Sequence, residues 1–462
     1  MNILFCSSEV VPFAKTGGLA DVAGALPKAL ATKGANVKIT MPLYKNIKPQ
    51  KMGTWPSSSI SKNIEIFFIK NDALFNRDGL YGTAAGDFPD NLDRFSYFCR
   101  KSLELAKEMN FKPDIIHCHD WQSALIPVYL KSIYRDDDFF EGTKIVFTIH
   151  NLAYQGLFPE SEFSKIGIYR DFYNIDGLEF YSKVNLLKGA LIFADHLTTV
   201  SPTYAKEIQT KEFGCGLEGV LYQRRHNLSG ILNGLDYDIW DPAKDNSLYE
   251  KFSPDNIAGK FEDKQRLQKE YGLKVSKSIP LFGMISRLAD QKGVDLIVNA
   301  LDELMEMNLQ IIILGTGEQR YHDMLKEAAS EHPDKLSLNL KFDDKLAHNI
   351  YAASDVFLMP SRYEPCGLGQ LISLKYGSIP LVFKTGGLAD TIEDFDEKRG
   401  FGNGFVFDKY DADEFLSTVE RAVDTYRVKE LWKGLLERAF ECDFSWEVSA
   451  KHYLDLYKRL SK

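Results

Sequence analysis

Short runs of apolar residues alternate with helix-length amphipathic segments in the first half of the chain. The first unit is an apolar run over residues 3–6, a helix-like segment over 22–33 that ends at Gly34, and a run over 37–41 that ends at Pro42. Strand, helix and strand in this order predict a βαβ unit. Further strands are expected at residues 64–69, 115–118, 145–149, 197–200 and 231–232, with helices such as 93–109 and 123–134 between them. The alternation predicts an α/β fold with a doubly wound parallel sheet.

The same alternation begins again after a polar, irregular stretch between Gly234 and Asn256. The strands expected in this second series are residues 281–285, 310–314, 336–340, 356–359 and 379–383. We therefore expect two Rossmann-like domains, 1–235 and 236–445, and an amphipathic C-terminal helix in 446–462 that packs back across the junction. Ligands bind at the carboxyl ends of strands in such sheets, so the site is expected in a cleft between the domains.

One heptapeptide, Lys-Thr-Gly-Gly-Leu-Ala-Asp, occurs at residues 15–21 and again at 384–390. Each copy follows an apolar run and leads into helix-like sequence, so each is expected to be a glycine loop between a strand and a helix. In such a loop the glycines let backbone N–H groups approach a ligand, while the helix N-terminus and the lysine favour negative charge. Two such loops would hold one anionic substrate from opposite sides. The alternative is that each glycine pair only makes a tight turn.

The composition indicates in which cellular compartment the protein is expected and which classes of binding partner are excluded. The 462 residues are 44% hydrophobic and 26% charged, and no apolar run has the length of a membrane span. Met1 leads directly into a short apolar strand without a basic leader, and the six cysteines form no C-x-x-C pair, so a cytoplasmic protein is expected. A formal net charge of −9 argues against nucleic-acid and anionic-membrane partners, which require an excess of Lys and Arg.

Longer motifs accompany the two heptapeptides along the chain. They are HCHDW at residues 117–121, HNLAYQG at 150–156, SPTYA at 201–205, ILNGLD at 231–236, SRLADQKG at 286–293 and SRYEPCGL at 361–368. In order and spacing these motifs resemble those of the bacterial glycogen synthase and plant starch synthase family, over essentially the whole chain. The resemblance implies a GT-B type glycosyltransferase with two Rossmann-like domains facing a cleft. It also implies that glucose is transferred from ADP-glucose to the non-reducing end of an α-1,4-glucan (glycogen or a maltooligosaccharide) with retention of configuration, without a metal or a cofactor.

Release of a sugar from a diphosphate leaves negative charge on the departing oxygens, so the site needs fixed cations and N–H donors. Arg287 and Lys292 suit this need, and the resemblance implies that they bind the diphosphate; a surface pair that caps a helix is the alternative. The resemblance also implies donor contacts from Lys15, Gly18, Asp21, Tyr81, Asn233, Thr385, Gly386 and Gly387. Asp21 could instead be only a helix cap.

The expected catalytic groups lie directly after expected strands. The resemblance places Glu364, in the Glu-Pro-Cys-Gly-Leu motif, beside the donor sugar and His150 beside the transferring glucosyl unit; a histidine satisfied within the core is the alternative for His150. Asp120, Trp121 and Asn151 are expected on the acceptor side, Asp120 through sugar hydroxyls and Trp121 by stacking.

The sequence His117-Cys118-His119-Asp120 also suggests a metal site, since all three residue types are ligands. On a strand, however, the two histidines share one face and Cys118 takes the other, so no metal is expected. Cys366 lies beside Glu364, but no histidine near it in sequence would activate it as a nucleophile. The Gly315-Thr316-Gly317 segment lacks the Lys-Ser/Thr ending of a P-loop and is expected to be a nucleotide-side turn.

Many related retaining transferases carry a second Glu eight residues after the first, but here that position is Ile372. The difference argues against a two-carboxylate mechanism. It leads to the hypothesis of front-face transfer, in which the leaving phosphate oxygen helps to take the acceptor's proton. Two rival functions are another nucleotide-sugar transferase with a small or lipid-linked acceptor, and a glucan-binding protein without catalysis. The intact Lys15, Arg287, Lys292 and Glu364 argue against the second rival.

Overall fold

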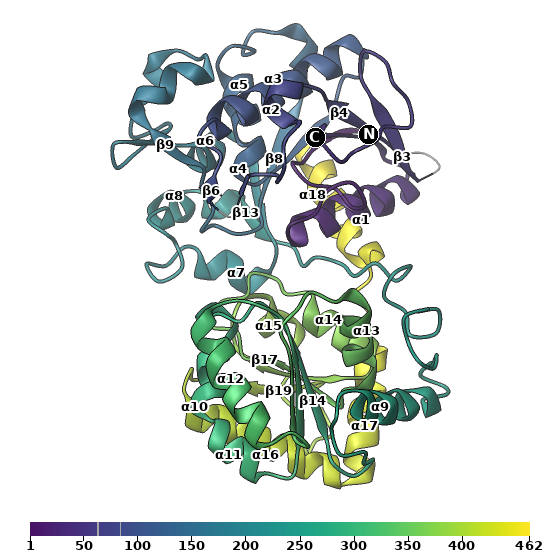
Figure 1. Ribbon diagram of the computed structural model, residues 1–462. Coiled ribbons are helices and arrows are strands. Elements are labelled where there is room, and N and C mark those ends of the chain that lie inside the picture. The colour runs from purple at the N-terminus through teal and green to yellow at the C-terminus, as the bar shows by residue number, and fades with distance from the viewer. Residues whose placement is uncertain (62–63, 84) are drawn as a thin grey trace. The chain divides into compact units, whose positions relative to one another are not determined.

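The computed structural model describes residues 1–61, 64–83 and 85–462, and it divides into two compact units (Figure 1). Unit 1 comprises Met1–Gly234 and Trp446–Lys462, and unit 2 comprises Leu235–Ser445. The main sheet of each unit is built mainly of parallel strands joined through helices, which confirms the α/β class that the alternating pattern predicts. Within the described ranges, no helix has both the length and the apolar character needed to cross a membrane.

An eight-stranded sheet forms the centre of unit 1, in the order β13-β12-β8-β7-β1-β2-β4-β3. Its strands are β1 (Asn2–Cys6), β2 (Asn36–Pro42), β3 (Ser57–Ser61), β4 (Ile64–Ile69), β7 (Ile115–His119), β8 (Lys144–Ile149), β12 (His196–Thr199) and β13 (Leu228–Gly230). Neighbouring strands are parallel except for the β3–β4 pair. Strands β1, β7 and β8 are buried along almost their whole length, which explains why their apolar runs are continuous rather than alternating.

The helices of unit 1 differ in two places from the pattern-based expectation. They are α1 (Gly18–Thr32), α2 (Asp72–Phe75), α3 (Asn91–Glu108), α4 (Asp120–Ser123), α5 (Leu125–Lys131), α6 (Leu186–Phe193), α7 (Pro202–Glu207), α8 (Glu218–Gln223) and α18 (Trp446–Leu460). Helix α1 begins at Gly18 rather than at residue 22, so the first glycine loop is itself the start of the helix. The helix expected over 123–134 is instead two short helices, α4 and α5.

Short elements complete unit 1. They are the 3-10 turns η1 (Asp138–Phe140), η2 (Glu160–Ile166), η3 (Arg170–Phe172) and η4 (Arg225–Asn227), and the small strands β5 (Gly82–Thr83), β6 (Gly86–Asp87), β9 (Leu157–Pro159), β10 (Glu179–Phe180) and β11 (Lys183–Asn185). The last helix, α18, packs against α1 (Figure 1). Its Ser449 hydroxyl donates to the carbonyl of Leu232 at 2.7 Å, and its Tyr457 hydroxyl lies 2.7 Å from Nδ1 of His117. The C-terminal helix therefore belongs to the core of unit 1.

Unit 2 is built on a six-stranded, all-parallel sheet in the order β16-β15-β14-β17-β18-β19. Its strands are β14 (Leu281–Ile285), β15 (Gln310–Leu314), β16 (Leu336–Asn339), β17 (Val356–Met359), β18 (Ile379–Phe383) and β19 (Phe405–Phe407). Its helices are α9 (Ala258–Glu270), α10 (Val294–Asn299), α11 (Leu301–Glu306), α12 (Gln319–Glu331), α13 (Asp344–Ala353), α14 (Gly369–Lys375), α15 (Gly386–Thr391), α16 (Ala412–Arg427) and α17 (Lys429–Glu441), with the 3-10 turn η5 (Asp290–Lys292). Two apolar clusters of buried residues form the core around this sheet.

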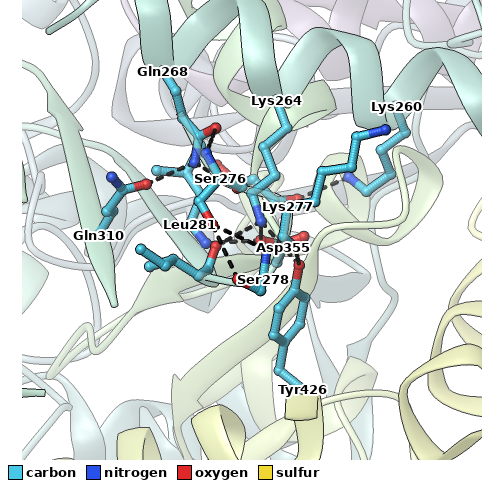
Figure 2. Close-up of polar contacts among 12 residues, drawn as sticks. Lys260, Lys264, Gln268, Ser276, Lys277, Ser278, Leu281, Gln310, Asp355 and Tyr426 are labelled. Atoms are coloured by element: carbon cyan, nitrogen blue, oxygen red, sulfur yellow. Dashed lines mark hydrogen bonds and ion pairs between the residues drawn. The ribbon is translucent and has the colours of Figure 1, made fainter. Parts of the chain in front are cut away.

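A buried ion pair fixes α9 to the amino ends of the central strands of unit 2 (Figure 2). The ammonium of Lys264 lies 2.6 Å from Oδ2 of Asp355, the residue before β17, and also donates to the Tyr426 hydroxyl at 2.9 Å. The same carboxylate oxygen accepts the backbone N–H of Leu281, the first residue of β14, at 2.7 Å. The pair therefore fixes one edge of the sheet, while the opposite edge carries the candidate site.

Candidate active site

The carboxyl edge of the unit 2 sheet gathers loops that are distant in sequence. Strands β15, β14, β17 and β18 are neighbours in that order, and parallel strands all end at the same edge. The loop after β14 carries Arg287 and Lys292, the loop after β17 carries Glu364, and the loop after β18 is the second glycine loop. The fold thus brings the expected catalytic and phosphate-binding residues of this unit to one place.

Lys292 and Glu364 are in direct contact at this edge. The lysine Nζ lies 2.5 Å from Oε2 of Glu364, and the hydroxyl of Ser361 donates to the same oxygen at 3.1 Å. Glu364 is only 8% exposed, so these two donors replace water around its charge. Gly293 permits the approach of the two loops, because a Cβ there would lie 2.1 Å from the carbonyl oxygen of Pro360.

Arg287, by contrast, is exposed, and its guanidinium donates to Oε1 of Gln291 at 3.0 Å. Arg287 and Lys292 both lie on the N-terminal side of α10. A helix N-terminus disfavours positive charge, so helix capping does not explain this pair of cations. An anionic ligand at the same edge would explain it.

The two copies of the heptapeptide use their glycines differently. In the second copy the glycines are required by packing: a Cβ on Gly386 would lie 2.0 Å from the carbonyl oxygen of Glu364, and one on Gly387 would lie 2.0 Å from that of Cys366. The N–H of Gly387 donates to the Glu364 carbonyl at 3.1 Å, so the expected contact between this N–H and a phosphate is not supported. The second loop instead fixes the backbone of Glu364, and Thr385 is buried.

The first copy is open. Gly17 and Gly18 are exposed, and apart from adjacent residues and the backbone of α1 itself, no described atom lies within 4 Å of the position that a Cβ would take on either residue. Packing therefore does not require these glycines, whereas a ligand approaching the backbone would. Lys15 pairs with Asp21 in the first turn of α1 at 2.8 Å, and α1 has no side-chain cap, so Asp21 is not the helix cap.

Glu9 organises this first loop and was missed in the sequence analysis. It is 3% exposed and accepts hydrogen bonds from the backbone N–H of Thr16 and from its hydroxyl, the latter at 2.6 Å. The Tyr81 hydroxyl donates to Oε1 of Glu9 at 2.6 Å and also contacts the hydroxyl of Ser8 at 2.7 Å. Tyr81 is thus held at the first loop by its hydroxyl, rather than presenting it freely to a nucleotide. An acidic residue three positions after the first apolar run was the signal available in the sequence.

A third group of expected residues lies where β7 and β8 end side by side in unit 1. Oδ1 of Asp120 accepts the backbone N–H of His150 at 2.7 Å, and Nε2 of His150 lies 3.0 Å from Nδ1 of His119. Burial lowers the pKa of His150 to about 3, so the ring is neutral near neutral pH. Burial, with the charge of Glu9, raises the pKa of Asp120 to about 7. The Asn151 side chain accepts the N–H of Ala153 at 3.0 Å.

The raised pKa of Asp120 predicts how stability depends on pH. The folded state holds this proton more tightly than the unfolded chain, in which the pKa of the carboxyl is 3.8. The protonated carboxyl therefore contributes its full stabilisation below about pH 4, and this contribution is lost as the pH rises through about 7. Asp120→Asn keeps an acceptor for the N–H of His150 but does not titrate. We expect the wild-type protein to lose stability relative to this variant over that range in urea unfolding; parallel pH profiles would contradict the assignment.

The structure corrects the expectation that Trp121 stacks on an acceptor sugar. The indole is 8% exposed and packs edge to face against Phe95, with ring centroids 4.9 Å apart. A Cβ on Gly156, which has a φ of +64°, would lie 2.7 Å from the indole, so this backbone covers the ring closely. The indole therefore packs in the interior of unit 1 and does not present a face on which a sugar could stack.

Asn233, expected at the donor site, is buried. Asn233 is 5% exposed, and its Oδ1 has no hydrogen-bond partner among the described residues, so it is a buried acceptor available to a ligand.

Ile372, at the position of the second Glu of many transferases, packs in the apolar core. A Cβ on Gly315 would lie 1.8 Å from the carbonyl of Ser286, so this turn packs against the loop of Arg287.

Comparison with known proteins identifies the family. The starch synthase catalytic domain model matches residues 2–223, and the model for glycosyl transferases group 1 matches residues 263–433. The chain is 48% identical to the glycogen synthase of Geotalea uraniireducens strain Rf4, covering 99% of this chain and 98% of the relative, and 46% identical to that of Thermotoga maritima, covering 99% of both.

Solved structures similar to this chain indicate the same family of glycosyltransferases. The catalytic domain of starch synthase IV from Arabidopsis thaliana, bound to ADP and acarbose, matches with a TM-score of 0.88 and 37% identity over 99% of each chain. Sucrose-phosphate synthase from Thermosynechococcus elongatus, with a TM-score of 0.65 and 15% identity over 99% of this chain and 98% of that one, shares the GT-B fold. Identity of this extent along the whole length shows that the chain belongs to the glycogen synthase and starch synthase family of glycosyltransferases.

Proposed function

We propose that this glycosyltransferase transfers glucose from ADP-glucose to the non-reducing end of an α-1,4-glucan, with retention of configuration. The observation that carries the proposal is the contact of Lys292 with Glu364 beside the exposed Arg287, at the carboxyl edge of unit 2. The Arabidopsis starch synthase IV domain, which binds ADP and the oligosaccharide analogue acarbose, supports both substrate classes. We propose no metal and no cofactor, because the two cations can stabilise the leaving diphosphate.

Arg287 and Lys292 stabilise the charge that develops on ADP as the glycosidic bond to phosphate breaks. Such groups are most effective when they are fixed before the reaction, because no reorganisation then accompanies charge development. Lys292 is fixed by Glu364, and Arg287 is held by Gln291. We propose that the carboxylate of Glu364, which holds the lysine, also accepts a hydrogen bond from a hydroxyl of the glucosyl unit.

For unit 1 we propose that Asp120, Asn151 and His150 contact the sugars. The open backbone at Gly17 and Gly18 suits a phosphate or sugar oxygen of the donor, with Lys15 nearby as a cation. Oδ1 of Asn233 is proposed to accept a hydrogen bond from a hydroxyl of the nucleotide sugar.

We propose that retention arises by front-face transfer. The leaving phosphate oxygen takes the proton of the acceptor hydroxyl while that hydroxyl attacks the anomeric carbon from the same side. The apolar burial of Ile372 supports this route, since the position offers no second carboxylate as a nucleophile. Trapping a glucosyl ester on Glu364 or Asp120 would contradict it.

We also propose a cytoplasmic location, supported by six free cysteines. The function is tested by a comparison of labelled ADP-glucose and UDP-glucose with glycogen, maltose or no acceptor. The expected result is incorporation from ADP-glucose into glycogen, with lower incorporation from UDP-glucose. Transfer only to a small or lipid-linked acceptor would favour the rival transferase, and glucan binding without turnover would favour a binding protein.

A further inference from the structure

The imidazole rings of His119 and His150 meet where β7 and β8 end. Nδ1 of His119 lies 3.0 Å from Nε2 of His150, and His119 is fully buried, with 0% exposure. Burial lowers the pKa of His119 well below its ordinary value and that of His150 to about 3. Both rings are therefore neutral near neutral pH, and one proton lies between the two nitrogens.

The second nitrogen of His119 shows which ring donates that proton. Nε2 of His119 is buried and has no hydrogen-bond partner among the described residues. If Nδ1 of His119 accepted, its proton would be on Nε2 as a buried donor without an acceptor. If Nδ1 donates, Nε2 is only an acceptor without a donor, which is the less costly defect because buried N–H groups without partners are the rarer case.

The surroundings of the ring provide no substitute acceptor. Phe5 and His117 pack beside His119, with ring centroids 4.2 Å and 4.1 Å from that of His119 and interplanar angles of 34° and 40°. Phe5 carries no acceptor atom in its side chain, and both ring nitrogens of His117 already contact other groups, Nε2 the Thr148 hydroxyl and Nδ1 the Tyr457 hydroxyl. The arrangement in which Nδ1–H of His119 donates to Nε2 of His150 is the one that these contacts favour.

We propose that His119 is a positioning residue that fixes His150 as the Nδ1–H tautomer, so that His150 presents an N–H donor to a hydroxyl oxygen of the transferring glucosyl unit. This inference rests on the proposed role of His150 beside that sugar. The described residues place no hydrogen-bond partner on Nδ1 of His150, which leaves this donor for a ligand. Asp120 holds the backbone of the same residue, so main chain and ring are fixed independently.

The test combines nitrogen NMR of the full-length enzyme, labelled with nitrogen-15 in histidine, with steady-state kinetics. In the wild-type protein the nitrogen shifts of His150 are expected to report a proton on Nδ1. In His119→Phe, which fills the ring space without a donor, His150 is expected to populate both tautomers. For that variant kcat is expected to fall about tenfold, the cost of one hydrogen bond, with little change in KM for ADP-glucose.

Two further variants show whether the effect of His119→Phe comes from loss of the hydrogen-bond donor. His119→Asn keeps an amide donor near the place of Nδ1 and is expected to restore the tautomer and most of kcat. Tyr457→Phe removes the hydroxyl that contacts His117 and leaves the His119–His150 contact intact, so it is the matched control and is expected to change neither.

A proton on Nε2 of His150 in the wild-type protein would overturn the inference, and this measurement needs no variant. Full kcat in His119→Phe, while His150→Ala is inactive, would also overturn it and leave the proposed function standing. Absence of glucosyl transfer by the wild-type enzyme would count against the proposed function instead, and the NMR result would still decide the tautomer.

Discussion

Replacing Arg287 with alanine is expected to lower kcat about 10²–10³-fold, equivalent to about 2.7–4 kcal/mol of transition-state stabilisation. The physical reason is that the leaving diphosphate loses one of two fixed cations at the moment when charge develops on its oxygens. Arg287 is exposed, and among the described residues its guanidinium donates only to the side chain of Gln291, so the fold should not suffer. Steady-state kinetics with ADP-glucose and glycogen measure the effect.

The control for this variant is Arg320→Ala. Arg320 is another exposed arginine of unit 2, and it pairs with Asp290 and Glu318. Because no role in phosphate binding is proposed for it, kcat is expected to stay at the wild-type value. If Arg287→Ala and Arg320→Ala have the same modest effect, the leaving group is stabilised elsewhere and the assignment of Arg287 is wrong.

Lys264→Met is expected to destabilise unit 2 by about 3–5 kcal/mol, because it leaves the charge of Asp355 buried without its partner. The side chains of Lys264 and Asp355 are 1% and 4% exposed. Urea unfolding followed by hydrogen exchange reports the two units separately. Peptides from β14 and β17 are expected to lose protection at lower urea, while peptides from β1 and β7 keep theirs.

Two further variants show whether the loss comes from the unpaired charge. In the double variant Lys264→Met/Asp355→Leu the buried charge is absent, so part of the lost stability should return. Lys341→Met breaks an exposed pair with Asp343 and is expected to leave the urea profile unchanged. A double variant as unstable as the sum of its single changes would show that packing, and not charge, explains the loss.

Much of the fold follows from local pattern. Apolar runs predicted β14, β15, β17 and β18 at the bounds observed, and amphipathic spacing predicted α18, because buried parallel strands and one-sided helices leave strong periodic signals. Strand β19 (Phe405–Phe407) was not predicted, since three residues at the edge of a sheet carry too little pattern. The extent of α1 was also missed, because glycines weaken the helical signal at its first turn.

The site was predictable where it depends on strand order and not where it depends on tertiary packing. Lys292 and Glu364 meet because their loops leave adjacent parallel strands, which the motifs and the alternation imply. The two identical heptapeptides, however, present open glycines in one unit and packed glycines in the other. The burial of Trp121 and the three hydrogen bonds accepted by the side-chain carboxylate of Glu9 likewise depend on tertiary contacts.

Whether Arg287 and Lys292 bind the diphosphate of the donor is decided by a crystal structure of the enzyme with ADP. Phosphate oxygens are expected at about 2.7–2.9 Å from the guanidinium of Arg287 and from Nζ of Lys292, the distances of charge-assisted hydrogen bonds. If ADP binds at another edge of the unit 2 sheet and both cations face water, the assignment of these two residues is wrong.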